Sequence, residues 1–214
     1  MRNKLLLLVG GLMGAGGLFA LTIRLIGDPA PESKTLQSGD IIFQTSQSSQ
    51  SKAIQLATGS EYSHMGIIYV EGDQTFVYEA IQPVKLTPLD EWVARGKNQH
   101  YVVKRVKNSA EVLTAETLNR MKAVGNKFKG KNYDLYFEWS DERIYCSELV
   151  WKIYFEATGI AIGSLQQLKE FSLTSPEVKQ KLKERYGNNV PLHEKVISPE
   201  RMFNSDLLVT ICIH

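Results

Sequence analysis

Two strand-like segments joined by a tight turn constrain the fold of this chain more than any other feature. Ser63 to Val70 is a β-branched and aromatic run, and Phe76 to Ile81 repeats that composition after the turn Glu71-Gly72-Asp73. Such a pair predicts a β-hairpin. The fold should therefore contain an antiparallel sheet.

Further segments supply more strands and the helices that pack against them. Strands are expected at Ile41 to Phe43, after the turn Ser38-Gly39-Asp40, and at Tyr101 to Val106, with a short helix between the first strand and Ser63. The chain as a whole predicts an α+β fold, an antiparallel β-sheet or partial barrel packed against helices. Three helices are expected to start where a capping hydroxyl precedes a proline, at Thr87-Pro88, Ser175-Pro176 and Ser198-Pro199. Two of these helices are expected to end at Gly96 and Gly187. Two more helices are expected, one from about Thr114 to Lys127 and one after Cys146.

Composition excludes several other classes of protein. The 214 residues include 25 Lys+Arg, 23 Asp+Glu and 2 Cys, and 43% of them are hydrophobic. A disordered chain would have fewer apolar residues and more net charge, and a disulfide scaffold would have more cysteines. The formal net charge of +2 and the absence of a basic cluster with interleaved aromatics give no indication of a nucleic-acid partner. One domain is expected over residues 37–214.

The N-terminus carries an export pattern. Arg2 and Lys4 precede an uncharged run from Leu5 to Ile23, and residues 28–36 read as a polar linker. Residues 1–27 are therefore expected to be a signal peptide or a membrane anchor, with cleavage left open; a buried helix of the globular domain is the alternative. The basic end should stay inside, which places the domain on the extracytoplasmic side, periplasmic or secreted, or held at the inner membrane by an uncleaved anchor.

Cys146 is the first candidate for chemistry. It lies where the helical pattern of the segment up to Ala157 begins. A thiol at a helix N-terminus forms its thiolate more readily, because the unpaired N–H groups and the helix dipole favour negative charge. The alternative is a small buried apolar cysteine, and position alone does not decide between the two.

A histidine and a glutamate on the predicted hairpin supply partners. If Glu71-Gly72 forms a two-residue loop, His64 lies directly opposite Glu79, within reach of a carboxylate-to-imidazole hydrogen bond. A Glu that fixes the imidazole tautomer is what a general base needs. A cysteine at a helix start with a carboxylate-supported histidine on a strand is the papain-type arrangement.

Four motifs in a fixed order then identify a family. The chain resembles the circularly permuted NlpC-type papain-like cysteine hydrolases, in particular their YiiX/YebB-like branch, over about Leu36 to Phe203. His64 precedes Cys146 here, as permutation requires. The motifs are Leu36-Gln37-Ser38-Gly39-Asp40-Ile41-Ile42-Phe43, Tyr62-Ser63-His64-Met65-Gly66, Tyr78-Glu79-Ala80 and Tyr145-Cys146-Ser147-Glu148-Leu149-Val150.

The resemblance implies a Cys-His-Glu triad of Cys146, His64 and Glu79. It also implies hydrolysis of an amide, ester or thioester, with acyl transfer in related families. The expected substrate is a cell-wall peptide fragment or an acylated, lipid-like molecule in the cell envelope. The alternative function is a non-catalytic envelope module that binds such ligands in the papain-like cleft.

The remaining candidates are weaker. Tyr62 is expected either to donate a hydrogen bond to the oxyanion or to be an ordinary strand aromatic. The aromatic run from Tyr133 to Trp139 is expected to belong to the core or to line a substrate cleft. No cofactor and no metal are expected, since no His/Cys spacing resembles a zinc site; a metal held by the triad is the less favoured alternative. Cys212 reads as a buried strand residue and Asp40 as a structural turn residue.

Overall fold

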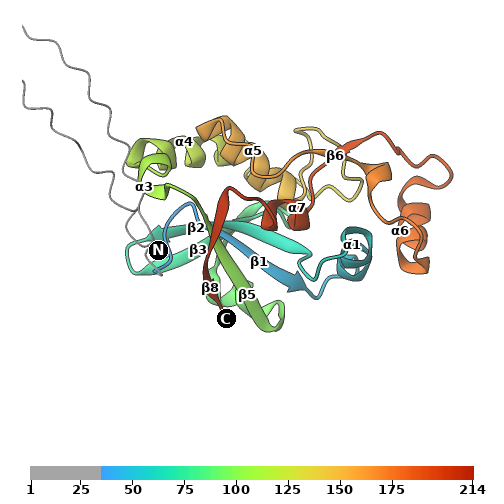
Figure 1. Cartoon of the computed structure of the whole chain (residues 1–214), viewed down its shortest axis with the longest axis horizontal. Helices are drawn as coiled ribbons and strands as arrows, with labels where there is room; N and C mark the ends of the chain where they lie inside the picture. Colours follow the sequence, from blue (N-terminus) through green and yellow to red (C-terminus); the bar gives the residue numbers. More distant parts are fainter. Residues whose placement is uncertain (1–34) are drawn as a thin grey trace, which may run out of the picture. The chain divides into compact units, whose positions relative to one another are not determined.

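An antiparallel sheet forms the centre of the protein, whose structure, a computed structural model, describes residues 35–214 (Figure 1). The six strands are ordered β4-β3-β2-β1-β5-β8, and each neighbouring pair is antiparallel. Helices cover the sheet, so the expected α+β class is confirmed. The strands are β1 (Ile41–Ser46), β2 (His64–Glu71), β3 (Gln74–Glu79), β4 (Lys85–Pro88), β5 (Gly96–Val106) and β8 (Leu208–Ile213).

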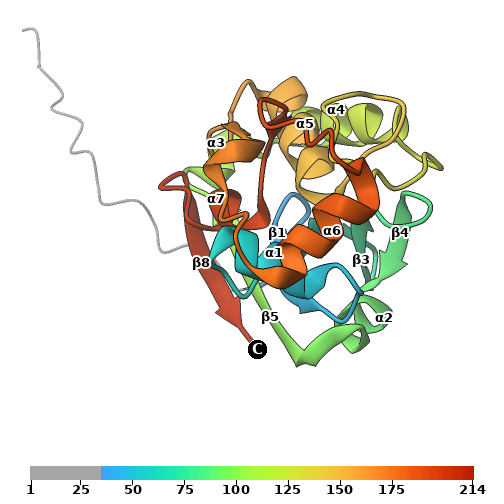
Figure 2. The ribbon, with the colours of Figure 1, turned by 90° about the vertical axis from the view of Figure 1, so that its right-hand side faces the viewer.

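Helices lie against both faces of this sheet. In Figure 1, α4 and α5 run along one side of the strands, and Figure 2 shows α1 and α6 side by side at one end of the molecule. A short two-stranded sheet, β6 (Gln166–Gln167) with β7 (Lys195–Val196), joins the C-terminal elements. The helices are α1 (Ser51–Thr58), α2 (Leu89–Ala94), α3 (Ser109–Val112), α4 (Ala115–Asn126), α5 (Cys146–Thr158), α6 (Pro176–Tyr186), α7 (Pro199–Phe203) and a 3-10 turn at Leu168–Glu170.

Strand alternation divides the apolar residues between two cores. Met65, Ile67 and Tyr69 of β2 belong to the larger core, which α4 and α5 share. Ile68, from the opposite face of the same strand, packs with Trp92 of α2 in a smaller core. Because successive side chains of a strand point to opposite faces, one strand serves both cores. His64, at the start of β2, lies on the same strand face as Ile68.

The hairpin forms as predicted, but its register differs by two residues. Val70 pairs with Thr75 and Glu71 with Gln74, so the loop is Gly72-Asp73 and not Glu71-Gly72. A shift of two residues keeps every side chain on its expected face, because the side-chain period of a strand is two. His64 and Glu79 are thus diagonal neighbours on one face and not direct opposites.

Most of the predicted helix ends are confirmed. Thr114 caps α4, and Ser175 and Ser198 cap α6 and α7 with proline in the next position. Gly187 follows the end of α6. The three hydroxyls accept a backbone N–H of the first helical turn, as expected for these caps.

The helix start at Thr87-Pro88 was predicted wrongly. Both residues end strand β4, and α2 begins only at Leu89 without a side-chain cap. The Thr87 hydroxyl donates instead to the Glu79 carboxylate, 2.6 Å away. Gly96 likewise opens β5, while Arg95 ends α2. Tertiary contact with a buried carboxylate has outweighed a local capping pattern.

The predicted signal peptide or anchor at residues 1–27 lies outside the described residues. Within residues 35–214, no helix has both the length and the apolar composition that crossing a bilayer requires. The boundaries of the N-terminal segment and its linker stay predictions.

Candidate active site

Helix α5 presents Cys146 at its first position. The backbone is extended at Tyr145 and turns helical at Cys146, whose side chain is buried. Two hydrogen bonds fix this helix start to the neighbouring chain: Ser147 Oγ donates to the Ile197 carbonyl at 2.7 Å, and the Ile197 N–H donates to Tyr145 Oη at 3.1 Å. The thiol is therefore held at the N-terminus of a helix, beside N–H groups that have no partner within the helix.

Strand β2 brings His64 to the thiol. The Nε2 atom of His64 lies 2.6 Å from Oε2 of Glu79, which leaves Nδ1 for Cys146. Burial disfavours the charged ring, but hydrogen bonds to Cys146 and Glu79 and the negative charge of both groups outweigh it and raise the pKa of His64 to about 9. An imidazolium is thus the favoured form at neutral pH.

The Glu79 carboxylate is held from the other side as well. It is fully buried at the end of β3, and its Oε1 atom accepts hydrogen bonds from Thr87 and Arg95. Burial alone would raise the pKa of Glu79, but hydrogen bonds from His64 and Thr87 and the charges of His64 and Arg95 lower it below its usual range. The carboxylate therefore stays ionised and fixes the orientation of the His64 ring.

A glycine makes room for this contact. Gly66 lies two residues after His64 on the same face of β2, next to the end of β3. A Cβ atom there would stand 2.4 Å from Cγ1 of Val77 and 2.8 Å from the carbonyl oxygen of Tyr78. A larger residue would thus push β3, and Glu79 with it, away from His64.

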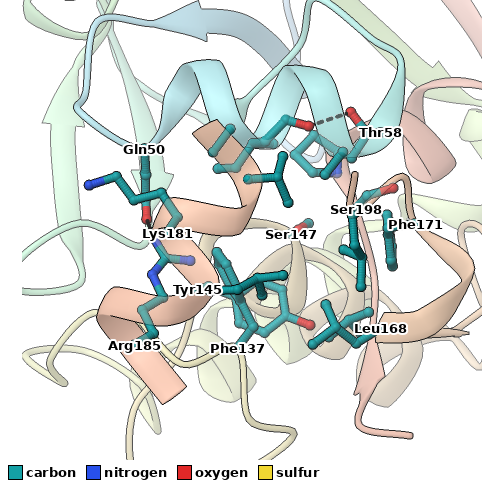
Figure 3. Close-up of a pocket in the computed structure, with 18 of the residues that line it drawn as sticks. Gln50, Thr58, Phe137, Tyr145, Ser147, Leu168, Phe171, Lys181, Arg185 and Ser198 are labelled. Atoms are coloured by element: carbon teal, nitrogen blue, oxygen red, sulfur yellow. Dashed lines mark hydrogen bonds between the residues drawn. The ribbon is translucent and has the colours of Figure 1, made fainter. Parts of the chain in front are cut away.

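Cys146 opens on one side into an apolar pocket of about 100 Å³ (Figure 3). Helices α1 and α6 form its walls, and the segment from Leu168 to Leu173 closes one side. Its lining is almost entirely carbon, and α6 adds Lys181 and Arg185 at the margin. Apolar residues that line the pocket include Ala53, Ile54, Ala57, Phe137, Leu168, Phe171, Leu173, Val178, Leu182, Val196 and Ile197.

His64 opens on the other side into a pocket of about 770 Å³ that is lined mainly by polar side chains. Its walls come from the end of β1, the segment after β3 and the end of α2, and they carry mainly amide and hydroxyl side chains. Gln50 and Tyr133 line both pockets and so mark the boundary between them. The reactive pair thus lies between an apolar and a polar binding space.

Tyr133 is a site residue that the sequence indicated only as part of an aromatic run. Its hydroxyl accepts a hydrogen bond from Gln50 Nε2 at 3.0 Å, and Gln50 Oε1 in turn accepts one from Arg185 at 2.7 Å. Figure 3 shows Gln50 and Arg185 pointing toward one another at one end of the apolar pocket. Burial and the neighbouring Cys146 raise the pKa of Tyr133 well above its usual value. The phenol of Tyr133 therefore stays protonated and can donate a hydrogen bond.

The other predicted residues make contacts of their own. Tyr62 stacks on Phe203, with ring centroids 4.2 Å apart, and contacts Phe43 edge-on. It belongs to the larger core and lines neither pocket, and its expected role at the oxyanion stays a prediction. Asp40 is a buried structural residue, as expected, and Cys212 is a free, half-buried thiol of β8.

Comparison with known proteins identifies the family. Residues 35–212 match the family described as permuted papain-like amidase enzyme, YaeF/YiiX, C92. The chain belongs to this YaeF/YiiX family. It is 50% identical over 175 residues to YiiX of Escherichia coli (strain K12), an uncharacterized protein, with 82% of this chain and 85% of YiiX covered.

A solved structure of the YaeF/YiiX family agrees with this fold. The crystal structure of the metalloprotein YiiX from Escherichia coli O157:H7 matches with a TM-score of 0.79 and 49% sequence identity. The match covers 83% of this chain and 97% of that one. The resemblance drawn from the four motifs is thereby confirmed, and this chain has the fold of a family of permuted papain-like hydrolases.

Proposed function

We propose that this protein is a cysteine amidase that removes an apolar acyl group from an amine. The observation that carries this proposal is the position of the Cys146–His64 pair between two unlike pockets, the thiol facing the apolar one and the imidazole facing the polar one. In a thiol hydrolase the nucleophile binds the acyl carbon and the acid serves the leaving group. The acyl part therefore belongs in the apolar pocket and the amine in the polar one.

Acylation starts from the thiolate–imidazolium pair. The Cys146 sulfur attacks the acyl carbon and forms a C–S bond, and the carbonyl oxygen becomes an oxyanion. His64 Nδ1 then gives its proton to the amide nitrogen, the C–N bond breaks, and the amine leaves. Glu79 holds Nε2 throughout, so the ring does not turn away.

Deacylation reverses the role of the imidazole. Neutral His64 takes a proton from water, the hydroxide attacks the thioester carbon, and the C–S bond breaks to release the carboxylic acid. The oxyanion of both steps would accept hydrogen bonds from the Cys146 backbone N–H and from Tyr133. Gln50 supports the phenol in this role, because its Nε2 atom fills an acceptor position of the hydroxyl, while the O–H of Tyr133 is directed at Cys146.

The apolar pocket favours an acyl chain over a cell-wall peptide. A peptide brings an N–H and a carbonyl for each residue, and these groups need hydrogen-bond partners when buried. The pocket beside Cys146 exposes mostly carbon, with a few polar side chains such as Gln50, Lys181 and Arg185 in its lining. A hydrocarbon chain needs no hydrogen-bond partners and gains about 25 cal/mol for each Å² of apolar surface removed from water. An extracytoplasmic location near a membrane, proposed from residues 1–27, fits such a substrate.

A metal does not fit the triad. The solved relative is described as a metalloprotein, but residues 35–214 contain no cluster of three or more His, Cys, Asp or Glu arranged to hold an ion. The Glu79 carboxylate already binds His64, Thr87 and Arg95 through hydrogen bonds and ion pairs. The positive charge of the Arg95 guanidinium would repel a metal cation at the same carboxylate. We therefore route no step through a metal.

The test uses N-dodecanoyl amides with the full chain in detergent or with the domain it contains. We expect release of dodecanoic acid by the wild type and no release by C146A, with a thioester adduct on Cys146 trapped by acid quenching and mass spectrometry. Tyr133→Phe should slow release about 10²- to 10³-fold, the usual loss for one oxyanion donor. Dodecanoyl compounds that bind without being cleaved would instead favour the non-catalytic binding module.

A further inference from the structure

The polar pocket next to His64 has a charge pattern that selects among amines. This inference rests on the proposed function and concerns the part of the substrate that leaves. Among the described residues that line the pocket, His64 and Arg95 are the ones that carry formal charge, and both are cationic at neutral pH. No Asp or Glu appears in that lining. A leaving amine with a second positive charge would find no counter-ion there.

Arg95 has donors left after binding Glu79. A guanidinium carries five N–H donors, and Arg95 donates from Nη2 to Glu79 Oε1. The side chain remains 42% exposed and lines the pocket, whereas Glu79 behind it is fully buried. The exposed edge of the guanidinium is thus presented to a ligand, and its planar fork matches a carboxylate or a phosphate.

Gln44 is a second feature that the fold itself does not satisfy. It is 1% exposed, lines the same pocket, and pairs directly with His64 across strands β1 and β2. Neither its Nε2 nor its Oε1 atom has a hydrogen-bond partner within the described part of the chain. A buried amide without hydrogen-bond partners is unfavourable, so a polar ligand group or an ordered water is expected beside it.

We propose that the polar pocket binds an anionic group on the amine part of the substrate, with Arg95 as its cation and Gln44 as a hydrogen-bonding neighbour. Glu79 lies between the His64 ring and Arg95, so the anion has to lie a few bonds beyond the scissile nitrogen. Together with the apolar pocket, this specifies an N-acyl amine that ends in a carboxylate or a phosphate. N-acylated amino acids are the simplest members of that class.

The experiment compares matched charged and neutral substrates. N-dodecanoyl derivatives of glycine, β-alanine and 4-aminobutyrate are each measured against their carboxamides, and N-dodecanoyl ethanolamine phosphate against N-dodecanoyl ethanolamine. We expect kcat/KM to favour the charged member of at least one pair about tenfold or more. The pair with the largest charged-to-neutral ratio shows whether the pocket prefers a carboxylate or a phosphate. Among the carboxylates, it also shows the preferred distance between the scissile nitrogen and the anionic group. Equal rates within all pairs would overturn the proposal.

Two variants separate recognition from catalysis. Arg95→Gln should bring the charged-to-neutral ratio close to one, even if both rates fall because Glu79 loses a partner. Thr87→Val is the matched control, because it also removes a hydrogen bond to Glu79 Oε1 but no charge; it should slow both substrates and keep the ratio. A ratio that survives Arg95→Gln contradicts the assignment to Arg95.

A measurement on the wild type covers the case in which Arg95→Gln does not fold. Raising the salt concentration from about 0.05 M to about 0.5 M shortens the screening length and should reduce the charged-to-neutral ratio, since Arg95 is partly exposed. A preference that does not respond to salt would argue against an ion pair. If no dodecanoyl compound is cleaved at all, the proposed amidase function is contradicted. That outcome is distinct from equal rates within the pairs, which contradict the binding of an anionic group by Arg95.

Discussion

Two buried carboxylates on the same sheet, Asp40 and Glu79, show how similar ion pairs serve different ends. Both residues are fully buried, and each is held by an arginine. Asp40 receives Arg105 on both oxygens, at 2.6 and 2.8 Å, and the Gln37 N–H at 2.8 Å. Arg105 is itself fully buried, so this pair is sealed inside the protein.

Glu79 differs in the surroundings of its partners. One of its oxygens holds His64, which lines a pocket, and the other holds Arg95, which is 42% exposed. Both partners can therefore change their charge or their contacts without unfolding the protein. The comparison indicates that the two carboxylates differ in the access of their partners to solvent and pockets, and not in their own burial.

Asp40→Asn should give the largest effect on stability. It removes the carboxylate charge from the buried pair with Arg105, and breaking such a pair is unfavourable by about 3–5 kcal/mol. Chemical denaturation measures the loss. Because Asp40 contacts neither pocket, kcat/KM per folded molecule should stay unchanged. A large loss of activity in fully folded D40N would erase the distinction between the two carboxylates.

Glu79→Gln should show the opposite pattern. His64 can lose its proton and Arg95 can turn to solvent, so the free energy of unfolding should change less than in D40N. Turnover should fall about 100-fold or more, within the range that acid–base catalysis contributes. Unchanged turnover with an intact fold would remove Glu79 from the triad.

The pH profile sharpens the role of Glu79. Proton donation to the leaving amine needs imidazolium, and the pKa of His64 is raised to about 9, so kcat/KM should hold at neutral pH and fall as pH rises through about 9. Glu79→Gln removes an interaction that raises this pKa. The alkaline decline should therefore move to lower pH in E79Q. A decline at the same pH in both proteins would contradict the pairing.

Thr87→Val should give the smallest effect. It deletes one hydrogen bond to Glu79 Oε1 and leaves the charge of the site intact. A lost hydrogen bond of this kind is worth about 1 kcal/mol, which corresponds to about a fivefold slower turnover. Steady-state kinetics measures the change, and T87S, which keeps the hydroxyl, should behave as the wild type.

The sequence was informative where short-range patterns decide the structure. The hairpin, the start of α5 at Cys146 and the proline-marked starts of α6 and α7 follow from strand alternation and capping. Even the error in hairpin register preserved the contact between His64 and Glu79, because it was a shift of two residues. Faces of strands can thus be predicted even when the loop is not.

Contacts between distant segments could not be predicted in this way. Tyr62 precedes the His64 strand and Tyr133 lies in a loop, and nothing in the local pattern says which phenol approaches Cys146. Thr87 has a perfect local capping pattern, yet it binds Glu79. The apolar pocket depends on α1 and α6, which are far apart in the chain and meet only in the folded protein.

The most direct test of the central claim is the alkylation rate of Cys146, followed by mass spectrometry from about pH 5 to about pH 9. Cys212 is an internal control, because burial raises the pKa of this free thiol and it lies apart from His64. We predict that Cys146 reacts at the acid end of this range, where ordinary thiols do not, and that His64→Ala abolishes this excess while Cys212 is unaffected. A Cys146 that reacts equally with and without His64 in a folded protein would contradict the thiolate–imidazolium pair.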